Sequence, residues 1–478
     1  MSGTVQRARS AQSAWSTTPV KQRVKVLRQL RRTIASRLDE IVATVSRDIG
    51  KPGMDALTGD VMVTLEMLRF YERHAEDALR PRRVGKPALL FSGTAFTESY
   101  EAHGVALIIA PWNYPFQLAM VPAITALAAG NAVILKCSER APETAGLIAS
   151  LFRESGVSAE LVQVTACSPA QTEAMIAERP DIIFFTGSSR NGTLVAQQAA
   201  ALLIPAVLEL GGKDACLVFA SCDLQRTVNG VCYGAFSNAG QVCVGAKRIY
   251  VQRPILQQFT QAFTERAGQL CVGDGVEADM GEVRFDFLRT LIAEQVDDAI
   301  ARGATLHTQW DRSSSSVPPL ILSNVSSDAR LLTEESFGPV VCIAAFDEAA
   351  EAVALANDSP FALSASVFTG DRKQGQRVAA AINAGHCTIN DCIRSVGNPY
   401  ASFGGNGGSG NGRYHGVAGL RSFTRTKTVM EMTGTRRTEV HWFPFTRSTY
   451  RALRGFLILR HSFRTPFQAL RRSFKRIP

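Results

Sequence analysis

Residues 104–136 read GVALIIAPWNYPFQLAMVPAITALAAGNAVILK, and this stretch decides the fold class. Residues 104–110 form an almost continuous apolar run that is typical of a buried strand. Residues 118–129 predict a helix, and residues 132–135 predict a second apolar strand. A strand, a crossover helix and another strand form a parallel βαβ unit, so the stretch predicts an α/β protein.

The same alternation continues on both sides of this unit. Downstream, the patterns predict strands at 161–164, 182–185, 216–219, 248–251 and 364–368, and helices at 141–155, from 170, and at 224–236, 254–267, 348–357 and 379–384. Upstream, residues 19–79 have helical spacing that is broken by a turn at 50–53, and residues 94–100 predict an extended strand leaving the main body. The glycine-rich run 404–412 is expected to lack regular structure. Parallel sheets covered on both faces follow from this order, with ligands expected at the carboxyl ends of the strands.

Length and composition restrict the class further. A chain of 478 residues predicts two domains or one large composite fold. No apolar run is long enough to span a bilayer, and the N-terminal residues lack the apolar core of a secretory signal. The ten cysteines have neither a CxxC pair nor a zinc-type spacing. We therefore expect reduced thiols, a cytoplasmic location and no metal site.

One cysteine and one glutamate stand out from this background. Cys243 follows a helical stretch that ends at Gly240, and a nucleophilic thiol needs such a bend to be exposed beside backbone N–H groups. Glu209 lies inside the apolar run before Gly211 and Gly212, where burial would raise its pKa towards that of a useful base. Taken singly, Cys243 could be a core thiol and Glu209 a capping or ion-paired carboxylate.

Taken together, the two segments resemble the aldehyde dehydrogenase superfamily. VLELGGK (207–213) and GQVC (240–243) match its motifs for the general base and the nucleophile, and their separation is typical of it. The resemblance covers residues 20–430 and implies that Cys243 attacks the aldehyde and Glu209 activates the water that hydrolyses the thioester. It also implies that Asn113, in PWNYP (111–115), donates its amide to the oxyanion together with the Cys243 N–H.

The resemblance implies NAD or NADP as the cofactor, with NAD favoured. The expected cofactor-binding residues are Trp112, Lys136, Ser138, Glu139, Gly187, Ser188, Gly192, Gly211, Glu335 and Phe337. Lys136 would contact the adenosine ribose, and a carboxylate at Glu139 would repel a 2′-phosphate. The turn FTGSSRNG (185–192) would hold the pyrophosphate at a helix N-terminus. Asp214 stands where the family has a small residue, a departure expected to leave the chemistry unchanged.

The resemblance is closest to the class 3-like branch, which implies a homodimer. The expected fold has a Rossmann-like parallel-sheet cofactor domain (1–82 and 102–211), an α/β catalytic domain (212–395) and a small β oligomerisation arm (83–101 and 396–430). An acylating or semialdehyde dehydrogenase is the alternative enzyme, and a non-catalytic scaffold with the same fold is the alternative outside enzymes. Glu209 disfavours the acylating enzyme, and the intact motif set disfavours the scaffold.

The remaining segment, 431–478, is a basic amphipathic tail. Residues 440–478 contain nine lysines and arginines and no acidic residue, so the rest of the chain carries a net charge of only +1. Aromatic and aliphatic residues recur among them at steps of three or four from Phe456 to Phe474, with Pro466 as an expected kink. A helix lying on an anionic membrane is the first hypothesis, and it would suit apolar long-chain or isoprenoid aldehydes. Packing on the protein is the second, and nucleic-acid contact has the least support.

Overall fold

The computed structural model describes residues 3–86, 91–273, 275, 277–312, 314, 316–432, 434 and 437–462. The chain divides into two compact units, which we describe separately. The larger unit contains residues up to 80 and residues 100–425, and the smaller one contains residues 81–99 and those from 426 onwards.

The first sheet of the larger unit has the strand order β17-β7-β6-β3-β4-β5. Its strands are β3 (Val105–Ile109), β4 (Ala132–Lys136), β5 (Val162–Thr165), β6 (Ile182–Thr186), β7 (Ala206–Glu209) and β17 (Gly410–Asn411). β3 to β7 are parallel, and β17 pairs with β7 in the antiparallel sense. The predicted βαβ unit is confirmed, since α6 (Gln117–Ala129) connects β3 and β4.

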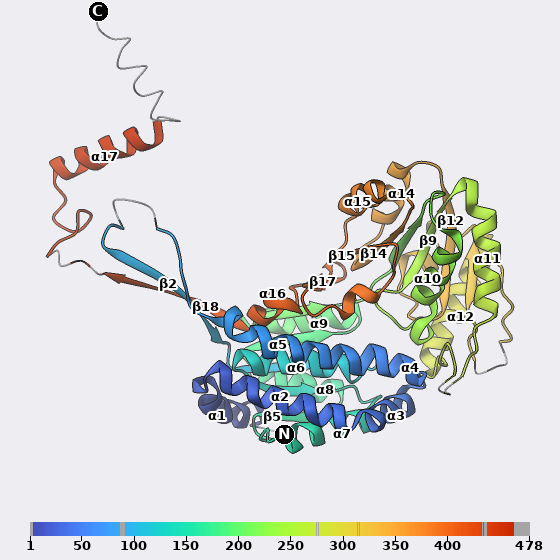
Figure 1. The fold of residues 1–478 in the computed structure, drawn as a ribbon, viewed down its shortest axis with the longest axis horizontal. Helices are drawn as coiled ribbons and strands as arrows, with labels where there is room; N and C mark the ends of the chain where they lie inside the picture. Colours follow the sequence, from blue (N-terminus) through green and yellow to red (C-terminus); the bar gives the residue numbers. More distant parts are fainter. Residues whose placement is uncertain are drawn as a thin grey trace, which may run out of the picture. The chain divides into compact units, whose positions relative to one another are not determined.

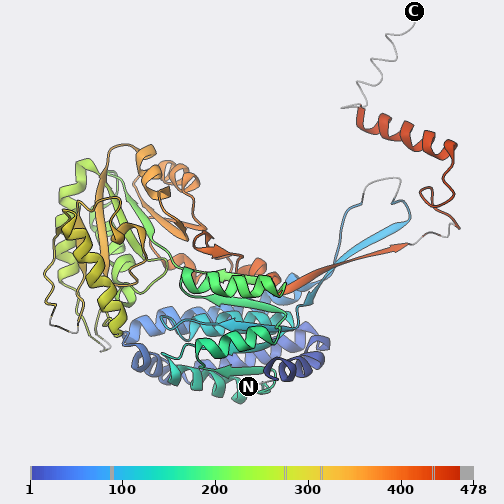
Figure 2. The same ribbon diagram turned by 180° about the vertical axis from the view of Figure 1, so that it is seen from behind.

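Helices cover both faces of this sheet (Figure 1). The N-terminal ones are α1 (Thr4–Thr17), α2 (Val20–Ser36), α3 (Leu38–Ile49), α4 (Gly53–Asp55), the π-helical η1 (Ala56–Met62) and α5 (Val63–Leu79). Those that follow the strands are α7 (Pro142–Glu154), α8 (Pro169–Ala177), α9 (Ser189–Ala201) and α16 (Gly416–Ser422). Figure 2 shows α8 and α9, in green, on the side opposite to the blue α2 and α5.

The second sheet of the larger unit has the order β10-β11-β12-β9-β8-β14-β15. Its strands are β8 (Asp214–Val218), β9 (Ala246–Gln252), β10 (Thr305–Leu306), β11 (Leu320–Ser323), β12 (Val340–Phe346), β14 (Ser364–Phe368) and β15 (His386–Ile389). Alternate residues of β8 enter two different cores: Cys216 and Val218 face α10 (Leu224–Phe236) and α11 (Leu256–Gly268). Ala215 and Leu217 face α14 (Ala349–Asn357) and α15 (Arg372–Ala381).

Smaller elements complete this unit. They are the 3₁₀ turns η2 (Ser237–Gly240), η3 (Arg253–Ile255) and η4 (Arg394–Gly397), the helices α12 (Asp286–Ala301) and α13 (Arg330–Thr333), and the strand pair β13 (Phe361–Ala362) and β16 (Asn406–Gly407).

Two of the expectations are wrong. The glycine-rich run contains regular structure, because β16 and β17 pair with β13 and β7. Such short pairings need backbone groups at the right place and no side-chain pattern, so periodicity cannot reveal them. The helix expected at 379–384 ends at Ala381, since it is the last part of α15.

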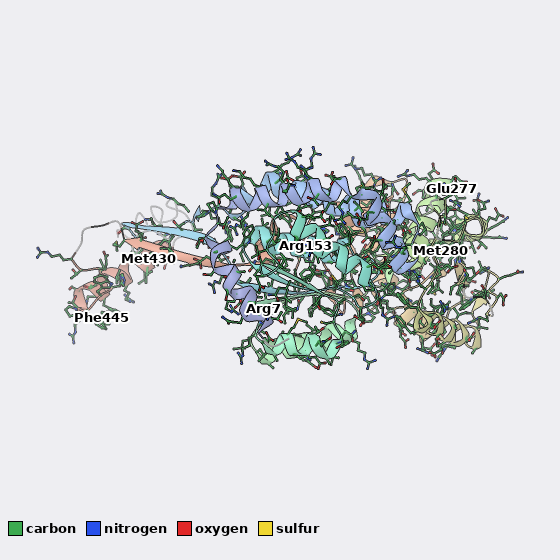
Figure 3. The ribbon with its side chains drawn as sticks, turned by 90° about the horizontal axis from the view of Figure 1, so that it is seen from below. Arg7, Arg153, Glu277, Met280, Met430 and Phe445 are labelled. Atoms are coloured by element: carbon green, nitrogen blue, oxygen red, sulfur yellow. The ribbon has the colours of Figure 1, made fainter. Side chains whose placement is uncertain are left out.

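The smaller unit contains a β arm and a helix. β1 (Arg82–Arg83), β2 (Thr94–Ala102) and β18 (Thr424–Met432) form a three-stranded sheet in the order β1-β2-β18, which confirms the extended strand predicted at 94–100. α17 (Arg447–Ser462) has no buried residue. Met430 of β18 and Phe445, both labelled in Figure 3, are 52% and 73% exposed. Among the described residues, no helix is both long and apolar enough to cross a membrane. The part of the predicted tail helix beyond residue 462 lies outside the described residues.

Candidate active site

The predicted site residues follow strands that end at one edge of the first sheet. Ile109 of β3 pairs with Lys136 of β4 and with Phe185 of β6, and Thr186 pairs with Glu209 of β7. The four carboxyl ends are therefore level. β3 lies between β4 and β6, where the chain reverses its direction of travel across the sheet, and open α/β sheets bind ligands at such a point.

The loop that carries the candidate nucleophile has a strained backbone. After α10 ends at Phe236, Asn238, Ala239 and Gly240 have φ values of 49°, 53° and 67°. A non-glycine residue with this conformation costs about 1–3 kcal/mol and persists only where its surroundings hold it. Asp55 accepts a hydrogen bond of 2.8 Å from the Asn238 N–H, which fastens the loop to α4. Cys243 stands at the end of this loop, partly exposed.

Asn113 is tied to the same loop in two directions. Its side-chain Nδ2 donates to the main-chain carbonyl of Gln241 at 3.0 Å, and the main-chain carbonyl of Asn113 accepts from Asn238 Nδ2 at 3.0 Å. The Asn113 side chain is buried. The fold thus places the predicted amide donor beside the segment that presents Cys243.

Glu209 ends β7 and is buried, and neither carboxylate oxygen has a hydrogen-bond partner among the residues that the structure describes. Burial raises the pKa of Glu209 well above its usual range, and the nearby Arg413 guanidinium opposes this only in part. Burial of a carboxylate without hydrogen bonds lowers the stability of the folded protein, so such a group is typical of a functional site. A raised pKa is what a general base at neutral pH requires.

The thiol of Cys243 is surrounded by acidic groups. Burial raises its pKa well above the ordinary value for cysteine, and the carboxyl groups of Asp214, Glu335 and Glu209 raise the pKa further. Asp214, which was expected to leave the chemistry unchanged, is a buried carboxyl within electrostatic reach of this thiol. Asp214 accepts a hydrogen bond from the Ser364 N–H at 3.2 Å through one oxygen, and its other oxygen has no hydrogen-bond partner among the described residues.

Glu335 and Phe337 lie on the loop between α13 and β12. The Gly212 N–H donates to Glu335 Oε1 at 3.2 Å, and burial raises the pKa of Glu335 to about 7. A Cβ on Gly211 would lie 2.3 Å from Glu335 Oε2, so only glycine allows this approach. Phe337 meets Trp112 edge to face at 5.5 Å between ring centroids. Four of the predicted cofactor residues thus form two contacting pairs, Gly211 with Glu335 and Trp112 with Phe337.

The other predicted cofactor residues lie at the ends of β4 and β6. Lys136 Nζ pairs with Glu139 Oε2 at 2.8 Å, and Ser138, two residues after the end of β4, accepts through its Oγ from the Arg140 N–H. Ser188 is the N-cap of α9, and Gly192 packs in its first turn against Leu210. A lysine and a carboxylate suit ribose hydroxyls, and the N-terminus of a 13-residue helix suits a pyrophosphate, so these residues fit a dinucleotide. The described part of the chain has no cluster of side chains that could hold a metal ion.

The sequence model of the Aldehyde dehydrogenase family matches residues 2–429. The chain belongs to this family. A 4,4'-diapolycopene aldehyde oxidase of Methylomonas sp is 37% identical over 451 residues, which are 94% of this chain and 85% of that protein. A protein of Mycolicibacterium smegmatis with the provisional name succinate-semialdehyde dehydrogenase [NADP(+)] is 32% identical, with 88% of this chain and 83% of the relative covered.

Solved structures of aldehyde dehydrogenases share the fold. Betaine aldehyde dehydrogenase of Staphylococcus aureus in complex with NAD+ superposes with a TM-score of 0.86 at 28% identity, over 92% of this chain and 89% of that one. An NAD-dependent aldehyde dehydrogenase of Sinorhizobium meliloti gives the same TM-score at 30% identity, over 92% and 88%. The predicted α/β fold class is confirmed. The protein is an oxidoreductase that oxidises an aldehyde with NAD or NADP.

Several residues of this aldehyde dehydrogenase site were missed at the level of sequence. Tyr114 lies beneath the buried Lys51, whose Nζ is 3.8 Å from its ring centroid, and Lys51 pairs with Asp60 at 2.8 Å. Phe285 meets Trp112 at 4.7 Å. Tyr114 stands in PWNYP (111–115), but the sequence pattern assigns it no contact, and it marks Lys51 only as part of a turn between helices. Asp55 had no signal at all, because an acidic residue in the first turn of a helix is common.

Proposed function

We propose that Cys243 forms a thioester with the substrate and that Glu209 activates the water that hydrolyses it. The Cys243 thiolate adds to the aldehyde carbonyl, and the Asn113 amide with the Cys243 N–H stabilises the oxyanion, which is worth a few kcal/mol in acyl transfer. Bound NAD or NADP supplies the acceptor for the hydride. The observation that carries the proposal is the buried carboxylate of Glu209, which has no hydrogen-bond partner in the described part of the chain and lies within electrostatic reach of Cys243.

Hydrolysis is favoured over transfer of the acyl group. An acylating enzyme passes the acyl group to a thiol or phosphate and needs no base for water. Here a carboxylate with a raised pKa lies within electrostatic reach of the nucleophile, which gives water an acceptor for its proton.

Two variants test these roles. We expect Cys243→Ala to abolish turnover and Glu209→Gln to give a burst of NADH followed by slow deacylation, both followed by absorbance in a stopped-flow instrument. Glu173→Gln, at an exposed position of α8, is the matched control. A Glu209→Gln enzyme with full steady-state activity would refute the assigned base.

We further propose an apolar aldehyde as substrate. Tyr114 lies within electrostatic reach of both Cys243 and Tyr233. Met54, Met62 and Tyr233 are more than half exposed. A Cβ on Gly397 would meet only Val63, at 3.6 Å. The segment 54–63 thus runs from Asp55, which lies within electrostatic reach of Tyr233, to Val63 beside Gly397, and the exposed Met54 and Met62 give it an apolar rim.

The charges on this rim disfavour an anionic semialdehyde. Tyr233 lies near the carboxyl groups of Asp55 and Asp391, and Arg394 is already paired with Asp391 at 3.1 Å. The diapolycopene aldehyde oxidase is the relative whose named substrate agrees with an apolar rim. We expect kcat/KM to rise from acetaldehyde to long apolar and isoprenoid aldehydes and to stay low for succinic semialdehyde. Gly397→Phe should depress only the long substrates, and Gly397→Ala is its control.

We propose a homodimer formed through the β arm. β18 is an edge strand whose residues after Thr424 are exposed, and such an edge is a template for pairing with another chain. The same proposal keeps the division into a cofactor domain (1–82 and 102–211), a catalytic domain (212–395), an arm (83–101 and 396–430) and a tail (431–478). Light scattering on the full chain should give twice the monomer mass. The variant Met430→Lys should lower the measured mass towards that of the monomer.

We also propose that α17 binds an anionic membrane surface. Tyr450, Leu453 and Leu457 recur at helical spacing on one face, and Arg447, Arg451 and Arg454 recur on another. Tyr450 and Leu457 are 69% and 50% exposed. Apolar side chains beside clustered arginines fit a lipid interface with negative headgroups.

Flotation with phosphatidylserine-containing liposomes tests this attachment. We expect the full chain to float, and a chain ending at Thr435 or the variant Arg447/Arg451/Arg454→Glu to stay in solution. Arg32/Arg69/Arg73→Glu, with the same charge change at exposed positions of α2 and α5, should still float. Equal flotation of all forms would contradict the proposed membrane binding by α17.

A further inference from the structure

Lys247 is the second residue of β9 and lies directly after the nucleophile loop. Its side chain is buried, and its Nζ donates to two carbonyl oxygens: that of Gly338 at 2.7 Å and that of Ala235 at 3.2 Å. These bonds span 91 and 12 residues of sequence. One ammonium group therefore joins the end of α10 to the loop that carries Glu335 and Phe337.

The turn at Gly240 and the loop that carries Glu335 and Phe337 are closely packed at this point. A Cβ on Gly240 would lie 2.2 Å from the Gly338 carbonyl oxygen and 2.7 Å from Lys247 Nζ. Gly240 also has a φ of +67°, so both the close packing and the backbone conformation require glycine at this position. The turn that leads into Cys243 thus packs directly on the backbone next to Phe337, with Lys247 Nζ in contact with both.

A buried lysine at this position has identifiable partners. The Ala235 carbonyl is among the last of α10, where helix carbonyls lack an intrahelical donor and the helix dipole favours a cation. Burial, followed by the nearby Lys213, lowers the pKa of Lys247 to about 7, while Glu335 and Asp214 act to raise it. Both the ammonium and the neutral amine keep at least two N–H donors, so both bonds can persist through this titration.

We propose that Lys247 is a positioning residue that holds the Cys243 loop in register with the loop of Glu335 and Phe337. In the reaction, the carbon attached to Cys243 gives up a hydride, and the acceptor is bound by the second loop; this role therefore rests on the proposed function. Hydride transfer depends steeply on the separation of the two centres, and a misplacement of about 1 Å costs about 100-fold. Attack of Cys243 on a carbonyl requires no such register.

The difference between these two reactions provides the test. Lys247→Met keeps the aliphatic volume and removes both donors. We expect aldehyde oxidation and the pre-steady-state NADH burst to fall about 10- to 100-fold, with KM for the aldehyde unchanged. Hydrolysis of p-nitrophenyl acetate without cofactor, which needs Cys243, Asn113 and Glu209, should fall less than about threefold by the same argument. Lys247→Arg keeps the donors and should recover part of the oxidation.

The outcomes separate the roles. Lys25→Met, at an exposed position of α2, is the control and should match the wild type in both assays. Equal loss of ester hydrolysis and oxidation, or no loss of either, would overturn the role in register. Failure of both Lys247 variants to give folded protein would show that the residue serves stability alone and would also overturn it. A wild-type chain without aldehyde oxidation would instead refute the proposed function.

Discussion

The Asn113 side-chain amide donates to the Gln241 carbonyl at 3.0 Å, two residues before Cys243. In this state the predicted oxyanion donor holds the nucleophile loop. The same amide has a second N–H, so it can keep this bond and still offer a donor to the substrate oxygen. The proposed oxyanion stabilisation and the shape of the loop are therefore linked through one side chain.

Replacing Asn113 should show both roles. Asn113→Ala should lower the rate of hydride transfer by about 100- to 1,000-fold, as the loss of one oxyanion donor does elsewhere. It should also loosen the loop, because the Gln241 carbonyl, two residues before Cys243, loses the hydrogen bond from Asn113 Nδ2. A stopped-flow NADH burst measures the first effect, and faster alkylation of Cys243 measures the second. An unchanged burst rate would contradict the assignment.

The pH dependence of Cys243 alkylation follows from its raised pKa. Since burial and three carboxyl groups raise that pKa above the ordinary value, thiolate is scarce at neutral pH in the cofactor-free enzyme. The alkylation rate should rise with each unit from pH 6.5 to 9.5 without a plateau, and NAD+ should increase it at any fixed pH. Mass spectrometry of the Cys243 peptide measures the rate, and the exposed Cys271 serves as an internal reference.

Asp214 should modulate this reactivity. It is the first of the carboxyl groups that raise the pKa of the Cys243 thiol, so Asp214→Asn should lower that pKa and speed alkylation near neutral pH. The amide keeps an acceptor for the Ser364 N–H, which limits the structural damage. The variant contradicts the account if its alkylation rate equals that of the wild type across the pH range.

The buried pair of Lys51 and Asp60 should matter for stability. Asp60 accepts from Lys51 Nζ at 2.8 Å and from the N–H groups of Phe116 and Gln117, so it also caps α6. Removing one partner of a buried pair costs about 3–5 kcal/mol. We expect Lys51→Met to lower the melting temperature by several degrees, measured by calorimetry. Asp77→Asn, which breaks the exposed pair with Arg80, should have almost no effect.

Cofactor preference should depend on Glu139. Partial burial acts to raise the pKa of this carboxyl, but the hydrogen bond from Lys136, a backbone hydrogen bond and the charges of Lys136 and Arg140 together outweigh it and keep the pKa below the usual range. A charged Glu139 would repel a 2′-phosphate, so Glu139→Gln should shift the ratio of kcat/KM values towards NADP about 10-fold. Steady-state assays with both cofactors decide this, and an unchanged ratio would remove Glu139 from the recognition of the ribose.

The sequence by itself determined the order of strands and helices and the chemical groups available to the site. Apolar periodicity reflects local backbone geometry, so α10 and the strands β3, β4 and β6 are visible without a structure. The motif residues Cys243, Glu209 and Asn113 are recognised for a different reason, because GQVC, VLELGGK and PWNYP resemble motifs of the aldehyde dehydrogenase family.

Only the tertiary structure decided how those groups are held. The hydrogen bond from Asn113 to Gln241 joins residues 128 positions apart in the sequence. Packing also brings Asp214 near Cys243, pairs β17 with β7 at Glu209, and sets the two hydrogen bonds of Lys247. No local pattern specifies such contacts, because they arise where the carboxyl ends of separate strands and the loops after them meet at one edge. Burial at that edge shifts the pKa values of Glu209 and Cys243, and their chemistry follows from it.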